Sequence, residues 1–404
     1  MGNAILAKRF AVDVRSDRVT RALEGSIDGG GQKRAIGEIL THENNYIGVI
    51  KTWGNSTSRL GYHKLSNNNL PNLSLTYTDP DGGPSYANYM SVDRSTIGVY
   101  FIAYYYDNSD IRCDLVDFGT NNSSAPSAGS VVTVSRDIQC SDILCEVGGN
   151  DGYILSVRSS TNYVYNNLTI YQVNLNDDTL TVSNPTELYN LSGYDAFGAA
   201  MSAVGLFRLN TCFGIIGIDD TYSILHVRTY NRGQKNPLSD VKTIDISDYF
   251  TRSDRFLPKY ANEVSNGEIV LYYDDMLCWI DVYDGILRTG LKIPELSGKG
   301  SPSYTVMAKS DTTYSPEFYL VYYTYSSGLE VYKVTANTGD YTLRCEQIMT
   351  LPTPSDITDR YDISRAFVYE GYIYIVFDDG DGQWLFYYIK DKKLYRHNGF
   401  LLGA

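Results

Sequence analysis

The sequence predicts an all-β protein built from seven similar four-stranded units, and three observations support this. Tyr supplies 37 of the 404 residues, and Tyr and β-branched residues favour a pleated, half-buried surface. The same pair of strand-like runs, joined by a short polar turn, recurs seven times. The turns are evenly spaced along the chain, which unrelated hairpins would not be.

Each recurring hairpin consists of a Tyr- and β-branched-rich run, a turn and a second such run. In the first, 46–50 and 60–63 flank a turn at Gly54-Asn55-Ser56. The seven turns are centred on Asn55, Asn108, Asn162, Asp219, Asp274, Ser326 and Asp379, so successive centres lie 52 to 57 residues apart. This regular spacing predicts one repeating supersecondary unit.

Two further strands complete each unit. A run rich in small residues precedes the hairpins, at 36–41, 87–92, 143–147, 199–204, 260–264, 304–308 and 363–368. A more polar strand often follows, as at 130–135, 179–183, 242–246 and 342–346. Four strands in roughly 54 residues is the content of one propeller blade.

Seven such units predict a closed, seven-bladed β-propeller of four-stranded antiparallel blades over residues 36–404. The innermost strands of a propeller crowd around an axis, and the small side chains of 198–203 suit that position. Pro and Gly clusters such as 79–84 fall between units, where the chain passes from one blade to the next. The alternative is a stack of β-sandwich domains, which would need about seven strands per roughly 100 residues.

Residues 1–35 form an N-terminal arm with two interpretations. Phe10, Val12 and Val14 alternate with polar or small residues, as in a half-exposed strand that could pair near Leu394 and close the ring. Alternatively, 16–23 is a short helix capped by Ser16 that docks a partner.

Charge and hydropathy exclude several classes of partner. The formal net charge is −13, which gives no general attraction to nucleic acid or to an anionic membrane. No apolar run is long enough for membrane insertion, and 1–15 lacks the apolar core of a secretory signal. We therefore expect the six cysteines to be reduced thiols.

The sequence contains no recognisable catalytic or zinc-binding constellation. There is no Gly-x-Ser-x-Gly motif, and the four histidines lie in different units. We therefore expect a protein that is not an enzyme. A glycosidase stays open, because 379–384 resembles the latter half of the repeated turn of sialidases, although the leading Ser of that turn is absent.

Calcium is the one cofactor that the sequence suggests. Asp79 and Asp81 share one tight turn, and Asp379 and Asp381 share another. Oxygen-rich turns are what calcium requires, but neither turn continues to the distal Glu of a full calcium loop. The alternative is that Asp and Gly simply make good turns.

Tyrosine is the remaining candidate for binding. Adjacent tyrosines such as 322–323 place one ring on each face of a strand, and in a propeller both faces pack against neighbouring blades. Tyrosines in turns are better placed to make rigid amphipathic contacts with proteins or carbohydrates. Tyr163, Tyr165 and Tyr222 are therefore the candidate binding residues.

The repeated units resemble the β-propeller superfamily from Ile36 to Ile389, without the Trp-Asp signature of WD40 blades or the paired glycines of kelch blades. No enzyme family is implied. The acidic composition, the arm and Asn-rich turns such as 67–69 and 121–122 are also similar to structural proteins of tailed bacteriophages.

The bacteriophage resemblance implies a non-enzymatic virion protein of the tail, a hub or a fibre, made in the host cytoplasm. Its partners would be other virion proteins, through the arm and one propeller face, and a host surface protein or glycan. Two alternatives stay open: a carbohydrate-active propeller, either a lectin or a glycoside hydrolase, and an intracellular, cytoplasmic scaffold that binds proteins.

Overall fold

The computed structural model of the protein describes its strands and part of the segments between them. The described residues are 20–21, 35–42, 45–54, 57–64, 73–78, 87–96, 99–106, 110–117, 127–136, 140–158, 167–219, 221, 223–232, 234–249, 261–273, 275–296, 305–309, 314–355, 357–359, 362–369, 372–378, 384–390, 393–396 and 398–399.

Seven antiparallel sheets follow one another along the chain, each built from consecutive strands. The first three are β2 (Ala35–His42), β3 (Asn45–Gly54), β4 (Thr57–Lys64) and β5 (Leu73–Thr78); β6 (Ala87–Thr96), β7 (Val99–Tyr106), β8 (Asp110–Asp117), β9 (Ser127–Ala128) and β10 (Val132–Ser135); and β11 (Cys140–Gly148), β12 (Asp151–Arg158), β13 (Asn167–Asn176) and β14 (Thr181–Leu191).

The other four sheets are β15 (Met201–Arg208), β16 (Phe213–Asp219), β17 (Ile224–Tyr230) and β18 (Lys242–Asp245); β19 (Ala261–Ser265), β20 (Glu268–Tyr273), β21 (Met276–Asp281) and β22 (Ile286–Lys292); β23 (Thr305–Ala308), β24 (Glu317–Thr324), β25 (Gly328–Asn337) and β26 (Thr342–Leu351); and β27 (Asp362–Tyr369), β28 (Tyr372–Asp378), β29 (Trp384–Lys390) and β30 (Lys393–Arg396).

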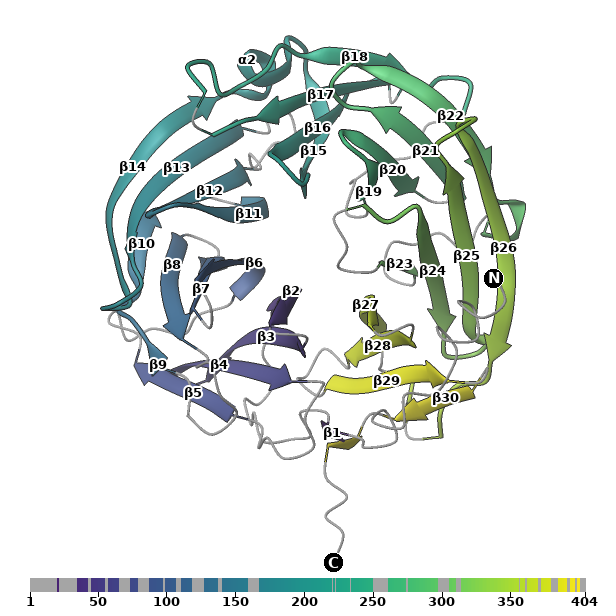
Figure 1. Ribbon diagram of the computed structural model, residues 1–404, viewed down its shortest axis with the longest axis horizontal. Helices are drawn as coiled ribbons and strands as arrows, with labels where there is room; N and C mark the ends of the chain where they lie inside the picture. Colours follow the sequence, from purple (N-terminus) through teal and green to yellow (C-terminus); the bar gives the residue numbers. More distant parts are fainter. Residues whose placement is uncertain are drawn as a thin grey trace, which may run out of the picture.

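The seven sheets are the blades of a β-propeller. Figure 1 shows them arranged radially around a central opening, with the first strand of each blade innermost. The all-β, seven-bladed fold predicted from the turn spacing is therefore confirmed. In the second blade the outer strand is interrupted, since β9 and β10 both pair with β8. Between them the Gly129 N–H donates to the Leu115 carbonyl at 2.9 Å.

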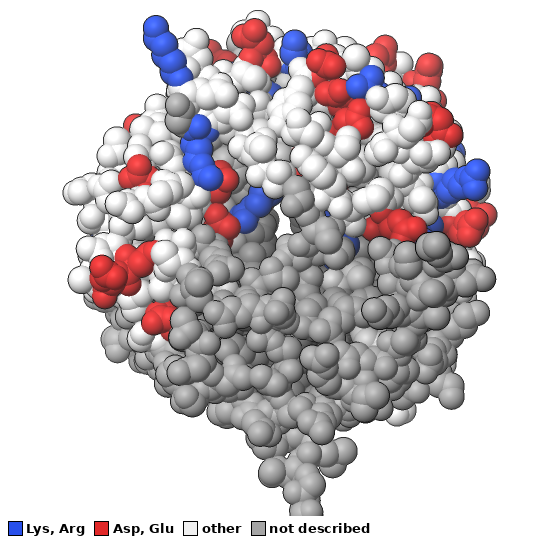
Figure 2. Space-filling model, in the orientation of Figure 1, with Lys and Arg blue, Asp and Glu red and all other residues white. Residues whose placement is uncertain are grey.

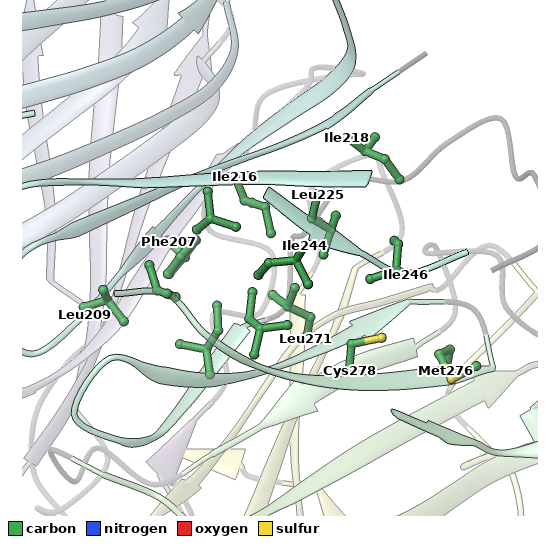
Figure 3. Packing of buried hydrophobic residues seen from close by; sticks show 14 of the residues in the cluster. Phe207, Leu209, Ile216, Ile218, Leu225, Ile244, Ile246, Leu271, Met276 and Cys278 are labelled. Carbon is green, nitrogen blue, oxygen red and sulfur yellow. The ribbon is translucent and has the colours of Figure 1, made fainter. Parts of the chain in front are cut away.

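The hydrophobic core is divided among the interfaces between successive blades. On β16, Phe213 and Ile215 pack towards the third blade, while Ile216 and Ile218 pack towards the fifth. Figure 3 shows the second of these clusters, where Ile216 and Leu225 face Leu271 across the interface. Each blade thus buries both faces against its neighbours, as the period of two along a strand requires.

The adjacent tyrosines follow the same rule. Tyr322 packs in the cluster between the fifth and sixth blades, and Tyr323 packs in the cluster between the sixth and seventh. Both rings are buried. Tyr323 also meets Phe377 edge to face, with ring centroids 4.9 Å apart. These tyrosines are structural, as expected from their positions inside strands.

A few short elements of the described residues lie outside the blades. The arm residues of β1 (Thr20–Arg21) pair with β31 (Asn398–Gly399) in a separate two-stranded sheet, so they form a strand and not part of a helix. The short 3₁₀ helix η2 (Pro294–Leu296) follows the fifth blade. Within the described residues, no helix has the length and apolar character needed to cross a membrane.

The helix α2 (Gly193–Phe197) corrects one detail of the predicted fold. The small residues 198–203 were expected to lie on an innermost strand from their first residue. Gly198 instead ends α2, with the left-handed φ of 74° that glycine tolerates, and the innermost strand begins at Met201. All six cysteines are free thiols, and five of them are buried.

Candidate binding surface

The innermost strands all point in the same direction along the axis of the opening, so the ring has two distinct faces. The Cys145 N–H donates to Ser91 Oγ at 3.0 Å, and the Val147 N–H donates to Asp93 Oδ2 at 2.7 Å. Both bonds join residues 54 positions apart, which is one repeat. Because successive strands of a blade are antiparallel, the turns between the second and third strands lie on the same face as the connections between blades. We call this face the hairpin-tip face.

The residues predicted to bind are three tyrosines and two pairs of aspartates, all nominated from the sequence. These residues are Tyr163, Tyr165, Tyr222, Asp379 and Asp381, together with Asp79 and Asp81. All seven lie outside the described residues.

Three described tyrosines on the hairpin-tip face were missed by the sequence interpretation. Tyr194 on α2 is 63% exposed, and Tyr325 in the turn between β24 and β25 is 51% exposed. Tyr249, in the connection after β18, is also exposed. Tyr325 could have been found, because it stands beside Ser326, the centre of the sixth turn.

The described acidic turn on this face is held by its own backbone. In the fourth turn, Asp219 Oδ1 accepts the N–H groups of Ser223 and Ile224 at 3.1 and 3.2 Å, and Oδ2 accepts the Thr221 hydroxyl at 2.6 Å. Such Asp-capped turns fix the backbone without a metal. Among the described residues, no group of His, Cys, Asp and Glu could hold a metal ion.

A charged cluster lies on the innermost strands and joins three blades. Arg208 on β15 donates to Asp93 Oδ1 on β6 at 2.9 Å and to the Cys145 carbonyl on β11 at 2.6 Å. It also approaches the Val92 carbonyl at 3.4 Å. Figure 2 shows basic and acidic side chains side by side at the upper edge of the central opening. Arg208 and Asp93 therefore connect the second, third and fourth blades.

A second pair reinforces the boundary between the third and fourth blades. Arg232 Nη1 lies 3.2 Å from Glu146 Oε1 and also donates to the Val147 carbonyl. The Arg232 side chain packs against Gly148. A residue with a Cβ at this position would place it only 2.9 Å from Arg232 Cδ. Burial raises the pKa of Glu146, while Arg232 and Arg208 lower it and Asp93 raises it.

Two carboxylates of the innermost strands accept hydrogen bonds from neighbouring backbone. Glu263 Oε2 accepts the Asn210 N–H of the fourth blade at 2.7 Å, and Oε1 accepts the Gly267 N–H at 3.0 Å. Asp142 Oδ2 of the third blade accepts the Leu206 N–H of the fourth at 3.0 Å. These carboxylates accept backbone N–H groups that would otherwise lack hydrogen-bond partners, and in this way they hold neighbouring blades together.

Cys278, Cys345 and His226 are poorly suited to nucleophilic chemistry. Burial raises the pKa of Cys278 and of Cys345 to about 12, so neither forms a thiolate near neutral pH. Burial lowers the pKa of His226, while Asp219 and the Phe197 backbone raise it. Its ring meets Phe197 edge to face, with centroids 6.5 Å apart.

No protein-family model and no curated protein sequence matches the chain. Among solved structures it is similar to Sqt1 from Chaetomium thermophilum, with 9% identity, a TM-score of 0.49, and 90% of this chain and 82% of that one covered. It is similar to the WD40 domain of SCAP from fission yeast, with 10% identity, a TM-score of 0.47 and 90% and 87% covered.

A third similar structure is the β-propeller domain of the Trilobed protease from Pyrococcus furiosus, with 9% identity, a TM-score of 0.44, and 91% of this chain and 98% of that one covered. At such identities these similarities concern the propeller fold only.

Proposed function

We propose that the protein is a non-enzymatic virion component of a tailed bacteriophage that binds a partner through its hairpin-tip face. The observation that carries the choice of face is that the two most exposed tyrosines among the described residues, Tyr194 and Tyr325, lie on it. Exposed tyrosines supply large, rigid contact areas at low entropic cost. The virion setting is supported by the acidic, Tyr- and Asn-rich composition and by the N-terminal arm.

The polar groups near the central opening support a binding role over catalysis. Asp93, Asp142 and Glu263 each accept a backbone N–H from a neighbouring blade or turn. Glycoside hydrolysis needs a pair of carboxylates that face a substrate, and these three serve the fold instead.

The location is tested by purifying particles from an infected or induced host culture and labelling them with an antibody to this protein. We expect the label at one fixed position on the tail or on a head-attached fibre. Recovery of the protein from the free cytosol alone, with unlabelled particles, would end the virion proposal.

The binding face is tested by a double variant, Tyr194→Ala with Tyr325→Ser, and a matched control on the opposite face, Tyr314→Ser with Tyr341→Ala. All four rings are exposed. We expect the first pair to lower incorporation into particles or adsorption to the host, and the control pair to leave both unchanged. Equal effects of the two pairs would remove the assignment of the face.

A lectin is the second candidate, because exposed tyrosine rings also suit sugar surfaces. A glycan array probed with the intact protein tests sugar binding, and the antibody labelling of particles decides whether a sugar-binding protein belongs to a virion. A panel of chromogenic glycosides separates a lectin from a glycoside hydrolase, because only the hydrolase releases the chromophore.

A further inference from the structure

We propose that β26, the outer strand of the sixth blade, pairs edge to edge and antiparallel with β26 of a second copy of the chain. β26 stands at the end of its sheet, where no described strand pairs with its outer side. Figure 1 shows it at the outer rim of the ring. The inference concerns this rim, so it does not rest on the function proposed for the hairpin-tip face.

An unpaired strand edge is a place where another strand can add. It presents a row of backbone N–H and C=O groups, and proteins usually protect such edges by short strands, Pro, Lys or bulges. The outer strands of the seven blades differ in this protection. They can therefore be compared one by one.

Most of the outer strands are protected. β10, β18 and β30 have four residues each. β14 contains Pro185 and two register shifts, and β22 contains one register shift and ends in Lys292. β26 has ten residues without Pro or Lys, and its own register shift lies at Ile348, so Thr342–Gln347 is a regular edge. Only β5, with six residues, is comparable among the described outer strands.

Charge distinguishes β26 from β5, which has no charged residue. Arg344 and Glu346 are exposed on β26, on either side of Cys345. Because side chains alternate along a strand, both project from the same face of the sheet. Neither side chain makes an ion pair or a hydrogen bond with a described residue. The edge thus carries one positive and one negative charge without partners in the described chain.

These two charges are self-complementary. In an antiparallel pair centred on Cys345 of both copies, Arg344 lies opposite the partner's Glu346, and Glu346 lies opposite the partner's Arg344. Opposite charges directly across a strand pair are stabilising, and like charges are destabilising. The two-fold symmetry provides both contacts at once and closes the assembly at two copies. A second copy is therefore the occupant that this edge fits.

The first test is the oligomeric state of the full chain by sedimentation equilibrium. Backbone groups of the edge exchange water for strand partners at a small net gain, so we expect a weak dimer with a dissociation constant of about 1–100 μM. The measurement is made at about 0.15 M salt, where repulsion between two acidic chains is screened beyond about 8 Å. A chain that stays monomeric up to about ten times that concentration range would overturn the proposal.

The second test locates the interface by charge reversal. Arg344→Glu alone, or Glu346→Arg alone, places like charges in both contacts, so each variant should dimerise about tenfold more weakly. An equimolar mixture of the two variants restores opposite charges in both contacts. We expect this mixture to form heterodimers with about the affinity of the wild-type homodimer, detected by labelling one variant with a fluorophore.

The matched controls are Lys242→Glu on β18 and Glu187→Arg on β14, two exposed residues of other outer strands. They change the net charge by the same amounts, so they report any effect of overall charge. Each should dimerise within about twofold of the wild type, and mixing them should give no gain. Thermal unfolding checks that all four variants remain folded.

Two results would contradict the assignment of this edge even if the wild type dimerises. One is a loss in the control variants as large as that in the β26 variants, and the other is the absence of recovery on mixing Arg344→Glu with Glu346→Arg. Either result leaves the hairpin-tip face untouched, because that face is tested separately by Tyr194 and Tyr325.

Discussion

Arg208 and Asp93 form an ion pair at 2.9 Å although they stand 115 residues apart, on strands of the fourth and second blades. The third blade lies between these two blades in the chain. The pair can form because the innermost strands converge, and the same guanidinium donates to the Cys145 carbonyl of the third blade. A single side chain therefore fixes the relative positions of three blades.

We expect Arg208→Met to lower the free energy of unfolding by about 1–3 kcal/mol, because Asp93 and the Cys145 carbonyl then lose a charged donor in a partly buried site. A double-mutant cycle with Asp93→Asn should give a coupling of about 1–2 kcal/mol. Urea unfolding measures both.

The control for this cycle is the pair of Lys333 and Glu317, 3.0 Å apart within one blade. Since its side chains are about one third exposed, its coupling should be below about 1 kcal/mol. A coupling for Arg208 and Asp93 no larger than that of this pair would contradict the proposed bridging role.

The repeat could be predicted from the sequence because the second and third strands of each blade are buried on both faces. Tyr and β-branched runs mark such strands, and the polar turns between them mark the period. The innermost strand of the seventh blade, expected at 363–368, is β27 (Asp362–Tyr369). The cross-blade pair of Arg208 and Asp93 has no local signal, since only the closed ring brings these residues together.

The outer strands were predicted less well, for a physical reason. The fourth strand of the third blade was expected at 179–183, but β14 extends from Thr181 to Leu191. Most of its side chains are exposed, so no apolar alternation marks where it ends. Its Pro185 would argue against a central strand, but it is compatible with an edge strand.

Helix α2 was missed although its capping residues are present in the sequence. Ser192 accepts the Asp195 N–H at 3.1 Å, and the Ser192 hydroxyl donates to Asp195 Oδ2 at 2.6 Å. This resembles a capping box, with Gly198 as the C-terminal stop. The preference for strands in the surrounding repeat obscured this short local signal.

We expect Ser192→Ala to lower the free energy of unfolding by about 0.5–2 kcal/mol, the usual cost of losing an N-cap. Because α2 carries the exposed Tyr194, the same change should also weaken binding through the hairpin-tip face. Ser192→Thr retains both the hydroxyl donor and the acceptor and should restore most of the stability. Thermal unfolding of the three proteins checks the order, and an alanine variant as stable as the wild type would contradict it.

Because the core clusters lie between blades, we expect the stability of each blade interface to be sensitive to truncation of its buried side chains. Ile216→Ala should destabilise the protein by about 2–5 kcal/mol, since it removes a fully buried side chain from the contact of the fourth and fifth blades. Ile286→Ala should change the stability by no more than about 0.5 kcal/mol, because Ile286 is exposed on β22. Chemical unfolding compares the two variants, and equal effects would argue against packing between blades as the main source of stability.

Because His226 is buried, we expect the protein to lose stability on mild acidification. Burial lowers its folded pKa below the usual 6.5, although Asp219 and the Phe197 backbone act in the opposite direction. Between the folded and unfolded pKa values the unfolded chain binds more protons, so stability rises with pH through that window. The contribution of neutral His226 is therefore complete above about pH 6.5 and decreases as the pH falls below it.

The measurement is the free energy of unfolding of the wild type and of His226→Gln at pH 7.5 and at pH 5. The two proteins share every other titratable group, so the difference in their pH dependence isolates His226. We expect the wild type to lose more stability than the variant on going to pH 5. Identical losses would mean that the imidazole has the same pKa in the folded and unfolded chains, in conflict with its buried position against Phe197.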